Sequence, residues 1–244
     1  MLKYEVSWMK HPAFCIKWWH PLAVLIAIAA YILIPKDVFL PMNAGAPAPI
    51  LIIDAGHGGK DGGAVAANGT LESDINLDIA LRLEALARFW GRETVMTRSG
   101  DDIDYPPEAT TIAAKKKADQ NTRLELINST PEAILLSIHQ NSYPAAAPNG
   151  IQVFFGAEAG SDELADILQK NLTAQLLPEN RRVASKADGG VYLIRKAQCR
   201  SVLVECGFVS NPGDLQKLES EGYRTKLAVV MLASYLQYTK GNLL

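Results

Sequence analysis

From Ile50 onward, short apolar runs alternate with longer stretches whose apolar residues recur every three or four positions. Six runs rich in β-branched residues are predicted strands: Ile50–Asp54, Thr94–Thr97, Ala133–Ile138, Ile151–Phe155, Val191–Ile194 and Val202–Cys206. Helices are predicted over Leu71–Trp90, Pro107–Asn128, Ser161–Leu177 and Tyr223–Tyr238, and a short helix after Asn211-Pro212. Continuously apolar strands separated by helices are typical of an α/β fold. We expect a single domain with a mostly parallel, twisted sheet of about six strands, covered by helices on both faces.

Two histidines lie where such a sheet places its functional sites, at the carboxyl ends of strands. His57 follows the first predicted strand, and His139 follows the third. The chain has only four histidines, and the other two, His11 and His20, lie in the N-terminal part. Every histidine of the domain therefore lies at a predicted strand end, which favours a shared functional site.

The loop that carries His57 is rich in glycine, and a phosphate-binding role has to be considered first. A P-loop needs Ser or Thr after Gly59-Lys60, but Asp61 stands there. A dinucleotide-binding fingerprint that starts at Gly56 needs glycine at the same position. Both patterns fail. The glycines instead allow a tight turn and leave space around an imidazole.

Two imidazoles suit Zn²⁺, and catalytic zinc commonly takes two histidines and one carboxylate. Glu72 is the favoured third ligand because it lies near the N-terminus of the predicted Leu71–Trp90 helix, where the helix dipole favours an ionised carboxylate. Three other acids remain competitors on sequence grounds, namely Asp54, Asp61 and Asp74.

Glu205 interrupts an otherwise apolar strand, and a buried carboxylate is costly unless it is paired, hydrogen-bonded or bound to metal. It is the candidate general base for a zinc-assisted hydrolysis. Strand alternation sends Cys206 to the opposite face, which weakens a cysteine-nucleophile mechanism. A disulfide between Cys199 and Cys206 is one alternative, but the odd total of three cysteines favours two free buried thiols.

The N-terminal part contains an apolar stretch, Trp18–Pro35, without Asp, Glu, Lys or Arg. As a helix it would span ~27 Å, close to the hydrocarbon thickness of a bilayer. Lys3, Lys10 and Lys17 precede it, which is typical of an N-terminus that stays inside the cell. An uncleaved anchor is favoured over a cleaved signal peptide, because the polar region before it is long; a buried core helix is the third alternative. Residues 36–49, with Pro, Gly and Ala, are a predicted tether.

Composition excludes several classes of protein. A net charge of −2 argues against a nucleic-acid binder, and 48% hydrophobic residues argue against a disordered chain. The run Lys115–Lys117 is interpreted as a solvated helix face. The chain is therefore divided into residues 1–35 (anchor or signal segment), 36–49 (tether) and 50–244 (catalytic domain).

Five motifs in order carry a resemblance to a known family: Ile53–Gly63, Leu71–Leu77, Met96–Arg98, Ser137–Ser142 and Val204–Asn211. They resemble the zinc-dependent N-acetylmuramoyl-L-alanine amidases of the amidase_3 group. The likeness covers essentially Ile50 to Tyr238. A single domain behind a hydrophobic segment is similar to the spore cortex and germination amidases. Family members with an autoinhibitory helix have a longer segment between Ser142 and Ile151, so the resemblance implies an open site.

The resemblance implies that His57, Glu72 and His139 ligate Zn²⁺ and that Glu205 is the catalytic acid/base. The implied substrate is peptidoglycan, cut at the amide between N-acetylmuramic acid and L-alanine. Both membrane interpretations of the N-terminal segment place the rest of the chain outside the cytoplasm, either anchored to the membrane or secreted to the wall. An activator protein is left open. Two alternatives remain: a metal-binding but inactive wall-binding or regulatory module, and a zinc peptidase or deacetylase that uses the same residues.

Overall fold

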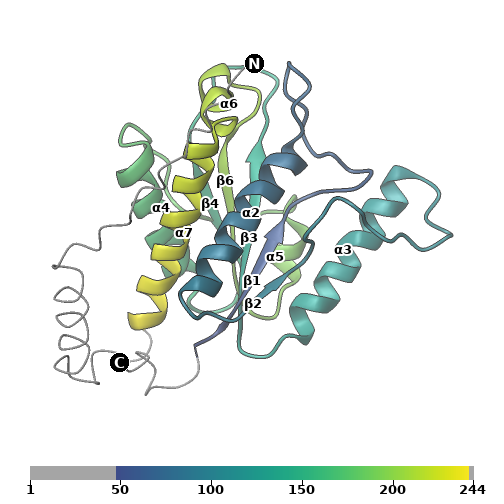
Figure 1. Ribbon diagram of the computed structural model, residues 1–244, viewed down its shortest axis with the longest axis horizontal. Helices are drawn as coiled ribbons and strands as arrows, with labels where there is room; N and C mark the ends of the chain where they lie inside the picture. Colours follow the sequence, from purple (N-terminus) through teal and green to yellow (C-terminus); the bar gives the residue numbers. More distant parts are fainter. Residues whose placement is uncertain (1–47, 242–244) are drawn as a thin grey trace, which may run out of the picture. The chain divides into compact units, whose positions relative to one another are not determined.

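A six-stranded sheet lies at the centre of the structure, a computed structural model that describes residues 48–241 (Figure 1). The strands are β1 (Ile50–Ala55), β2 (Thr94–Met96), β3 (Ala133–Asn141), β4 (Gln152–Phe155), β5 (Ser185–Lys186) and β6 (Arg200–Phe208), and their order is β2-β1-β3-β6-β4-β5. Neighbouring strands pair in parallel, except that β4 runs antiparallel to β6. The expected mostly parallel sheet of six strands is therefore confirmed.

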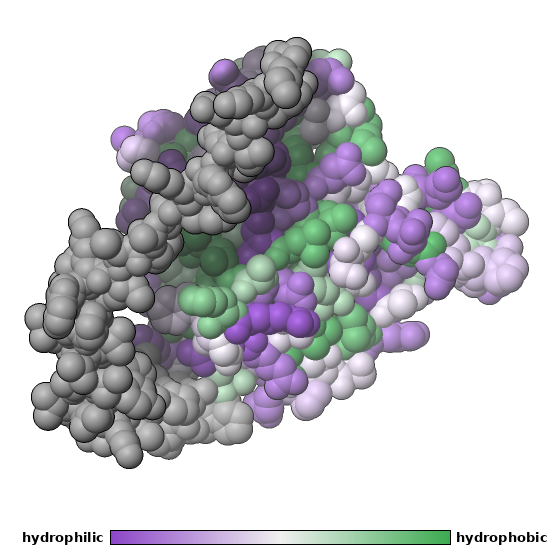
Figure 2. Space-filling view, in the orientation of Figure 1, coloured by the Kyte–Doolittle hydropathy of each residue, from purple (hydrophilic) through white to green (hydrophobic). Residues whose placement is uncertain are grey.

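Helices cover both faces of the sheet, as predicted. They are α2 (Glu72–Phe89), α3 (Ile112–Ser129), α4 (Ser161–Leu176), α5 (Tyr192–Lys196), α6 (Pro212–Leu218) and α7 (Glu221–Gly241). The larger core lies on the side of α2, α4 and α7, and the smaller core lies on the side of α3 and α5. Polar and apolar residues are intermixed on the outer surface that Figure 2 shows, as on most soluble domains.

Alternation along the strands decides which side chains can meet. Leu51 and Ile53 of β1 enter the larger core, whereas Ile52 enters the smaller one. On β6, Val204 and Cys206 likewise enter the larger core, which leaves Glu205 on the other face. The predicted separation of Glu205 from Cys206 is therefore confirmed.

One predicted strand is wrong. Residues Val191–Ile194 lie at the start of the short helix α5, in which Arg195 N–H donates to the carbonyl of Val191. The run is apolar because Ile194 is buried in the smaller core, and a short apolar run does not distinguish a strand from a helix turn. The sixth strand is instead β5, where Ser185 and Lys186 pair with Phe154 and Phe155.

Several element boundaries follow local capping chemistry. Helix α3 begins at Ile112, five residues after the predicted start, because the Thr111 side chain accepts a hydrogen bond from the amide of Ala114. Asn211 caps α6 in the same way, and Pro212 occupies the first turn, as expected. The segment between β3 and β4 contains no helix.

The predicted N-terminal segment and most of the tether lie outside the described residues. Within residues 48–241, no helix is both long and apolar enough to span a bilayer. Cys199 and Cys206 are both free thiols, as predicted, although Cys199 is only partly buried.

Candidate metal centre

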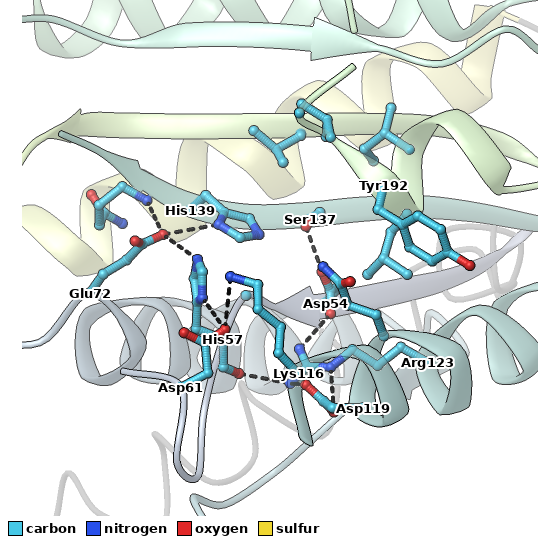
Figure 3. A pocket seen from close by; sticks show the side chains of 18 of the residues that line it. Asp54, His57, Asp61, Glu72, Lys116, Asp119, Arg123, Ser137, His139 and Tyr192 are labelled. Carbon is cyan, nitrogen blue, oxygen red and sulfur yellow. Dashed lines mark hydrogen bonds and ion pairs between the residues drawn. The ribbon is translucent and has the colours of Figure 1, made fainter. Parts of the chain in front are cut away.

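Three side chains meet above the carboxyl ends of β1 and β3. One ligand atom from each of His57, Glu72 and His139 lies within 4.8 Å of the other two. The Nδ1 atom of His139 lies 2.9 Å from Glu72 Oε1, and Nε2 of His57 lies 3.4 Å from the same oxygen. The two imidazole rings meet edge to face, with centroids 4.9 Å apart. They are the three residues that sequence analysis selects as metal ligands (Figure 3).

Glu72 is the first residue of α2 and is almost fully buried. Its Oε2 accepts a hydrogen bond from the amide of Ala64 at 2.8 Å, and its Oε1 accepts one from the amide of Gln140 at 3.0 Å. Burial alone would raise the pKa of Glu72, but the hydrogen bond and charge of His139 and the charge of His57 lower it to about 2. The carboxylate is thus held ionised and fixed in direction.

His57 sits at the tip of the glycine-rich loop in a left-handed backbone conformation, with φ of 60°. The Arg123 guanidinium donates to its backbone carbonyl at 2.7 Å. Its Nδ1 atom lies 2.9 Å from Asp61 Oδ2, so its Nε2 atom faces Glu72. A carboxylate behind a ligating imidazole fixes the ring orientation in many metal sites.

His139 lies near the end of β3, beside glycines that leave it space. A Cβ atom on Gly56 would overlap three atoms of the His139 ring. A Cβ atom on Gly63 would lie 2.6 Å from Glu72 and 2.8 Å from the His57 ring. Gly56 and Gly63 are therefore needed at these two positions because two imidazoles and a carboxylate pack directly against the loop backbone.

Glu205 stands beside His139 in the register of β3 and β6. Its Oε2 atom is buried and, among the described residues, has no hydrogen-bond partner. Burial raises the pKa of this carboxyl to about 7, and the charge of His139 only partly opposes that rise. A carboxyl group with that pKa can both take up and release a proton near neutral pH.

The three competing acids lie elsewhere. Asp54 is fully buried and forms an ion pair with Arg123 at 2.9 Å. Asp61 binds the far nitrogen of His57, and Asp74 is exposed on α2. None of the three belongs to the cluster.

A cavity of about 260 Å³ opens over the cluster and Glu205. One wall comes from α3, including Lys116 and Gln120, and a second wall from residues 190–194 at α5, including Tyr192. Sequence reasoning missed both walls. Lys116 and Gln120 belong to no motif, and the packing of α3 and α5 on the sheet brings these side chains to the site.

Two imidazoles and a buried acid lie at the carboxyl edge of the sheet, and the carboxylate of Glu72 reaches them from the start of α2. This arrangement is typical of metal-dependent hydrolases. The chain belongs to the N-acetylmuramoyl-L-alanine amidase family, whose model matches residues 51–234. It is 32% identical over 217 residues to the germination-specific N-acetylmuramoyl-L-alanine amidase of Bacillus subtilis (strain 168), and the match covers 88% of this chain and 90% of that protein.

Solved structures agree with this assignment. The CwlD amidase from Clostridioides difficile, solved in complex with the GerS lipoprotein, has a TM-score of 0.76 and 32% identity, and the match covers 79% of this chain and 99% of that chain. AmiC2 of Nostoc punctiforme, an N-acetylmuramoyl-L-alanine amidase, has a TM-score of 0.67 and 28% identity, over 80% and 99% of the two chains.

Proposed function

We propose that this protein is a zinc-dependent amidase that hydrolyses the bond between N-acetylmuramic acid and L-alanine in peptidoglycan. Membership of the amidase family supports the substrate and the bond. The observation that carries the mechanism is that His57, Glu72 and His139 line one cavity with Glu205, whose Oε2 atom has no hydrogen-bond partner among the described residues.

The ligand set fits a zinc ion. Two neutral imidazoles and one carboxylate are the ligands of many catalytic zinc sites, and they leave a position for water or substrate. Glu72 supplies an ionised carboxylate, and Asp61 fixes the ring of His57. When bound, zinc supplies a Lewis acid that polarises the scissile carbonyl and makes water a stronger nucleophile.

Glu205 moves the proton in the proposed reaction. Its free oxygen takes a proton from the attacking water as the new carbon–oxygen bond forms. The same carboxyl then gives that proton to the nitrogen of L-alanine as the carbon–nitrogen bond breaks. One water is consumed, and the products are the lactyl carboxylate of the sugar and a free amino terminus on the stem peptide.

The setting of the reaction forms part of the proposal. Residues 1–35 are proposed to export or anchor the chain, residues 36–49 to tether it, and residues 50–244 to form the catalytic domain outside the cytoplasm. The likeness to a germination-specific amidase supports a role on spore peptidoglycan. The likeness to an amidase that was solved in complex with a lipoprotein supports a protein partner for this chain as well.

An inactive wall-binding module of the same fold is the alternative. Glu205 argues against it, because a buried carboxyl oxygen without a hydrogen-bond partner in residues 48–241 lowers stability, and an inactive module gains nothing from it. A peptidase or deacetylase would use the same residues, and the products of hydrolysis distinguish these reactions.

Metal analysis of purified variants tests the assignment of roles. The full chain is expected to bind about one zinc, which His57→Ala and His139→Ala should lose because each removes one of three ligands. Glu205→Gln keeps its volume and should retain zinc while losing hydrolysis by at least ~100-fold, the range for a removed general base. Unchanged zinc in both histidine variants, or full activity in Glu205→Gln, would contradict the assignment.

A further inference from the structure

One lysine of the run Lys115–Lys117 forms an ion pair as well as facing solvent. The Nζ atom of Lys116 lies 3.0 Å from Asp61 Oδ2, the same oxygen that lies 2.9 Å from His57 Nδ1 (Figure 3). Lys117 is exposed, and Lys115 lies over the ring of Tyr105. The three neighbouring lysines therefore have three different environments.

Asp61 is held from two directions. The glycine-rich loop fixes it locally, because Asp61 exchanges two backbone hydrogen bonds with Gly58 and its Oδ1 accepts one from the amide of Gly63. Lys116 reaches the other oxygen from α3. Among the described residues, it is the one lysine or arginine within ion-pair distance of Asp61.

We propose that Lys116 is a positioning residue for the metal centre, which acts by holding the Asp61 carboxylate against Nδ1 of His57. The ammonium group and the imidazole N–H both donate to Asp61 Oδ2, so the lysine fixes the carboxylate in the place where it orients the ring. Nδ1 of His57 then carries the proton, and Nε2 is left free to face Glu72 and His139.

The contact also ties the metal centre to a wall of the cavity. Lys116 lines the cavity together with Gln120 of the same helix, while Asp61 belongs to the loop that carries His57. The side chain of Lys116 is 42% exposed, so its replacement leaves no buried hole and should not unfold the domain. A substitution at Lys116 therefore tests the support of the metal centre without removing a ligand from it.

The test measures zinc affinity of the full chain by competition with a chelator. Lys116→Met should weaken zinc binding roughly tenfold, the lower end of the effect known for residues behind metal ligands. Lys116→Arg keeps a cation at the same place and should restore most of the affinity. Lys117→Met is the matched control, a change of the same type on the adjacent residue, and should have no effect.

A double substitution shows whether Lys116 acts through Asp61. If it does, Lys116→Met in an Asp61→Asn background should weaken zinc binding no further than Asp61→Asn alone. Additive losses would overturn the proposal, as would Lys116→Met with wild-type zinc affinity.

A spectroscopic readout separates this inference from the proposed zinc function on which it rests. In zinc-free protein, ¹⁵N resonances of the His57 ring should show a proton on Nδ1 in the wild type and a mixture of tautomers in Lys116→Met. A wild-type chain that binds no zinc refutes the proposed function, whereas identical His57 resonances in the two proteins refute the role of Lys116.

Discussion

Two buried carboxyl groups of this molecule, Glu205 and Asp54, have pKa values shifted in opposite directions. Glu205 keeps an oxygen without a described partner, and its pKa is raised to about 7. Asp54 is also fully buried, but it accepts hydrogen bonds from Arg123, Ser137 and Thr97. Burial would raise the pKa of Asp54, yet the charges of Arg123 and His139 and the hydroxyl donors hold it below its usual range. One acid is poised to exchange a proton, and the other stays ionised.

The Asp54–Arg123 pair gives a prediction about stability and pH. Because the folded pKa of Asp54 lies below the unfolded value of about 3.9, its contribution is complete above that pH and is lost as the pH falls through the folded pKa. Asp54→Asn should cost ~3–5 kcal/mol at pH 7, since it leaves the buried Arg123 without one of its carboxylates. Urea unfolding at pH 7 and below pH 4 measures both effects.

The acid-induced loss of stability should be smaller in Asp54→Asn than in the wild type. Asp166→Asn is the control, because its ion pair with Lys170 is exposed and 3.7 Å long, and it should change the free energy of unfolding by less than ~1 kcal/mol. A variant at Asp54 as stable as the control would show that the buried pair contributes little.

Residues differ in how far the sequence reveals them. His57, His139, Glu72 and Glu205 stand out as candidates because each breaks a local pattern: histidines at strand ends, an acid at a helix start, an acid inside an apolar strand. Asp61 appeared only as a rival ligand, although it supports His57 from behind. Lys116 could not be found, since its direction depends on how α3 is rotated against the loop.

Among the elements, the glycine-rich loop between β1 and α2 sets the geometry of the cluster. Gly56 matters because the ring of His139 occupies the volume that a Cβ atom would fill. Gly56 thus leaves room for the imidazole ring of His139. The loop and β3 pack so closely that the backbone of one supports the side chain of the other.

Gly56→Ala should therefore displace the His139 ring. We expect zinc affinity and hydrolysis to fall at least tenfold, with ~1–3 kcal/mol of lost stability from overpacking. Gly100→Ala is the matched control, because a Cβ atom there meets nothing within 4 Å. Chelator competition and thermal unfolding of both variants provide the measurement, and equal behaviour of the two would contradict the steric argument.

The element that sequence reasoning assigned wrongly also borders the site. Residues Val191–Ile194 have the composition of a strand, but α5 uses them to bury Ile194 and to place Tyr192 along the cavity. Tyr192 then hydrogen-bonds to Asn121 of α3 at 3.2 Å. Tertiary contacts of this kind override local β preference in a short segment.

Over the whole molecule, the alternation of strands and helices was enough to predict a mostly parallel sheet with both faces covered. It did not predict that β4 reverses direction or that β5 has only two residues. Such edge features depend on connections between elements, which apolar periodicity does not encode. The carboxyl edge of β1, β3 and β6, where the site lies, was the predictable part because parallel strands bring it together.

Digestion of purified peptidoglycan by the zinc-loaded full chain, with mass analysis of the products, tests the central claim most directly. We predict free L-alanine amino termini on the stem peptides and glycan strands of unchanged length, and no free L-alanine amino termini in a parallel digest by Glu205→Gln. Cleavage within the glycan or within the stem peptide, loss of N-acetyl groups, or no cleavage at all would contradict the account.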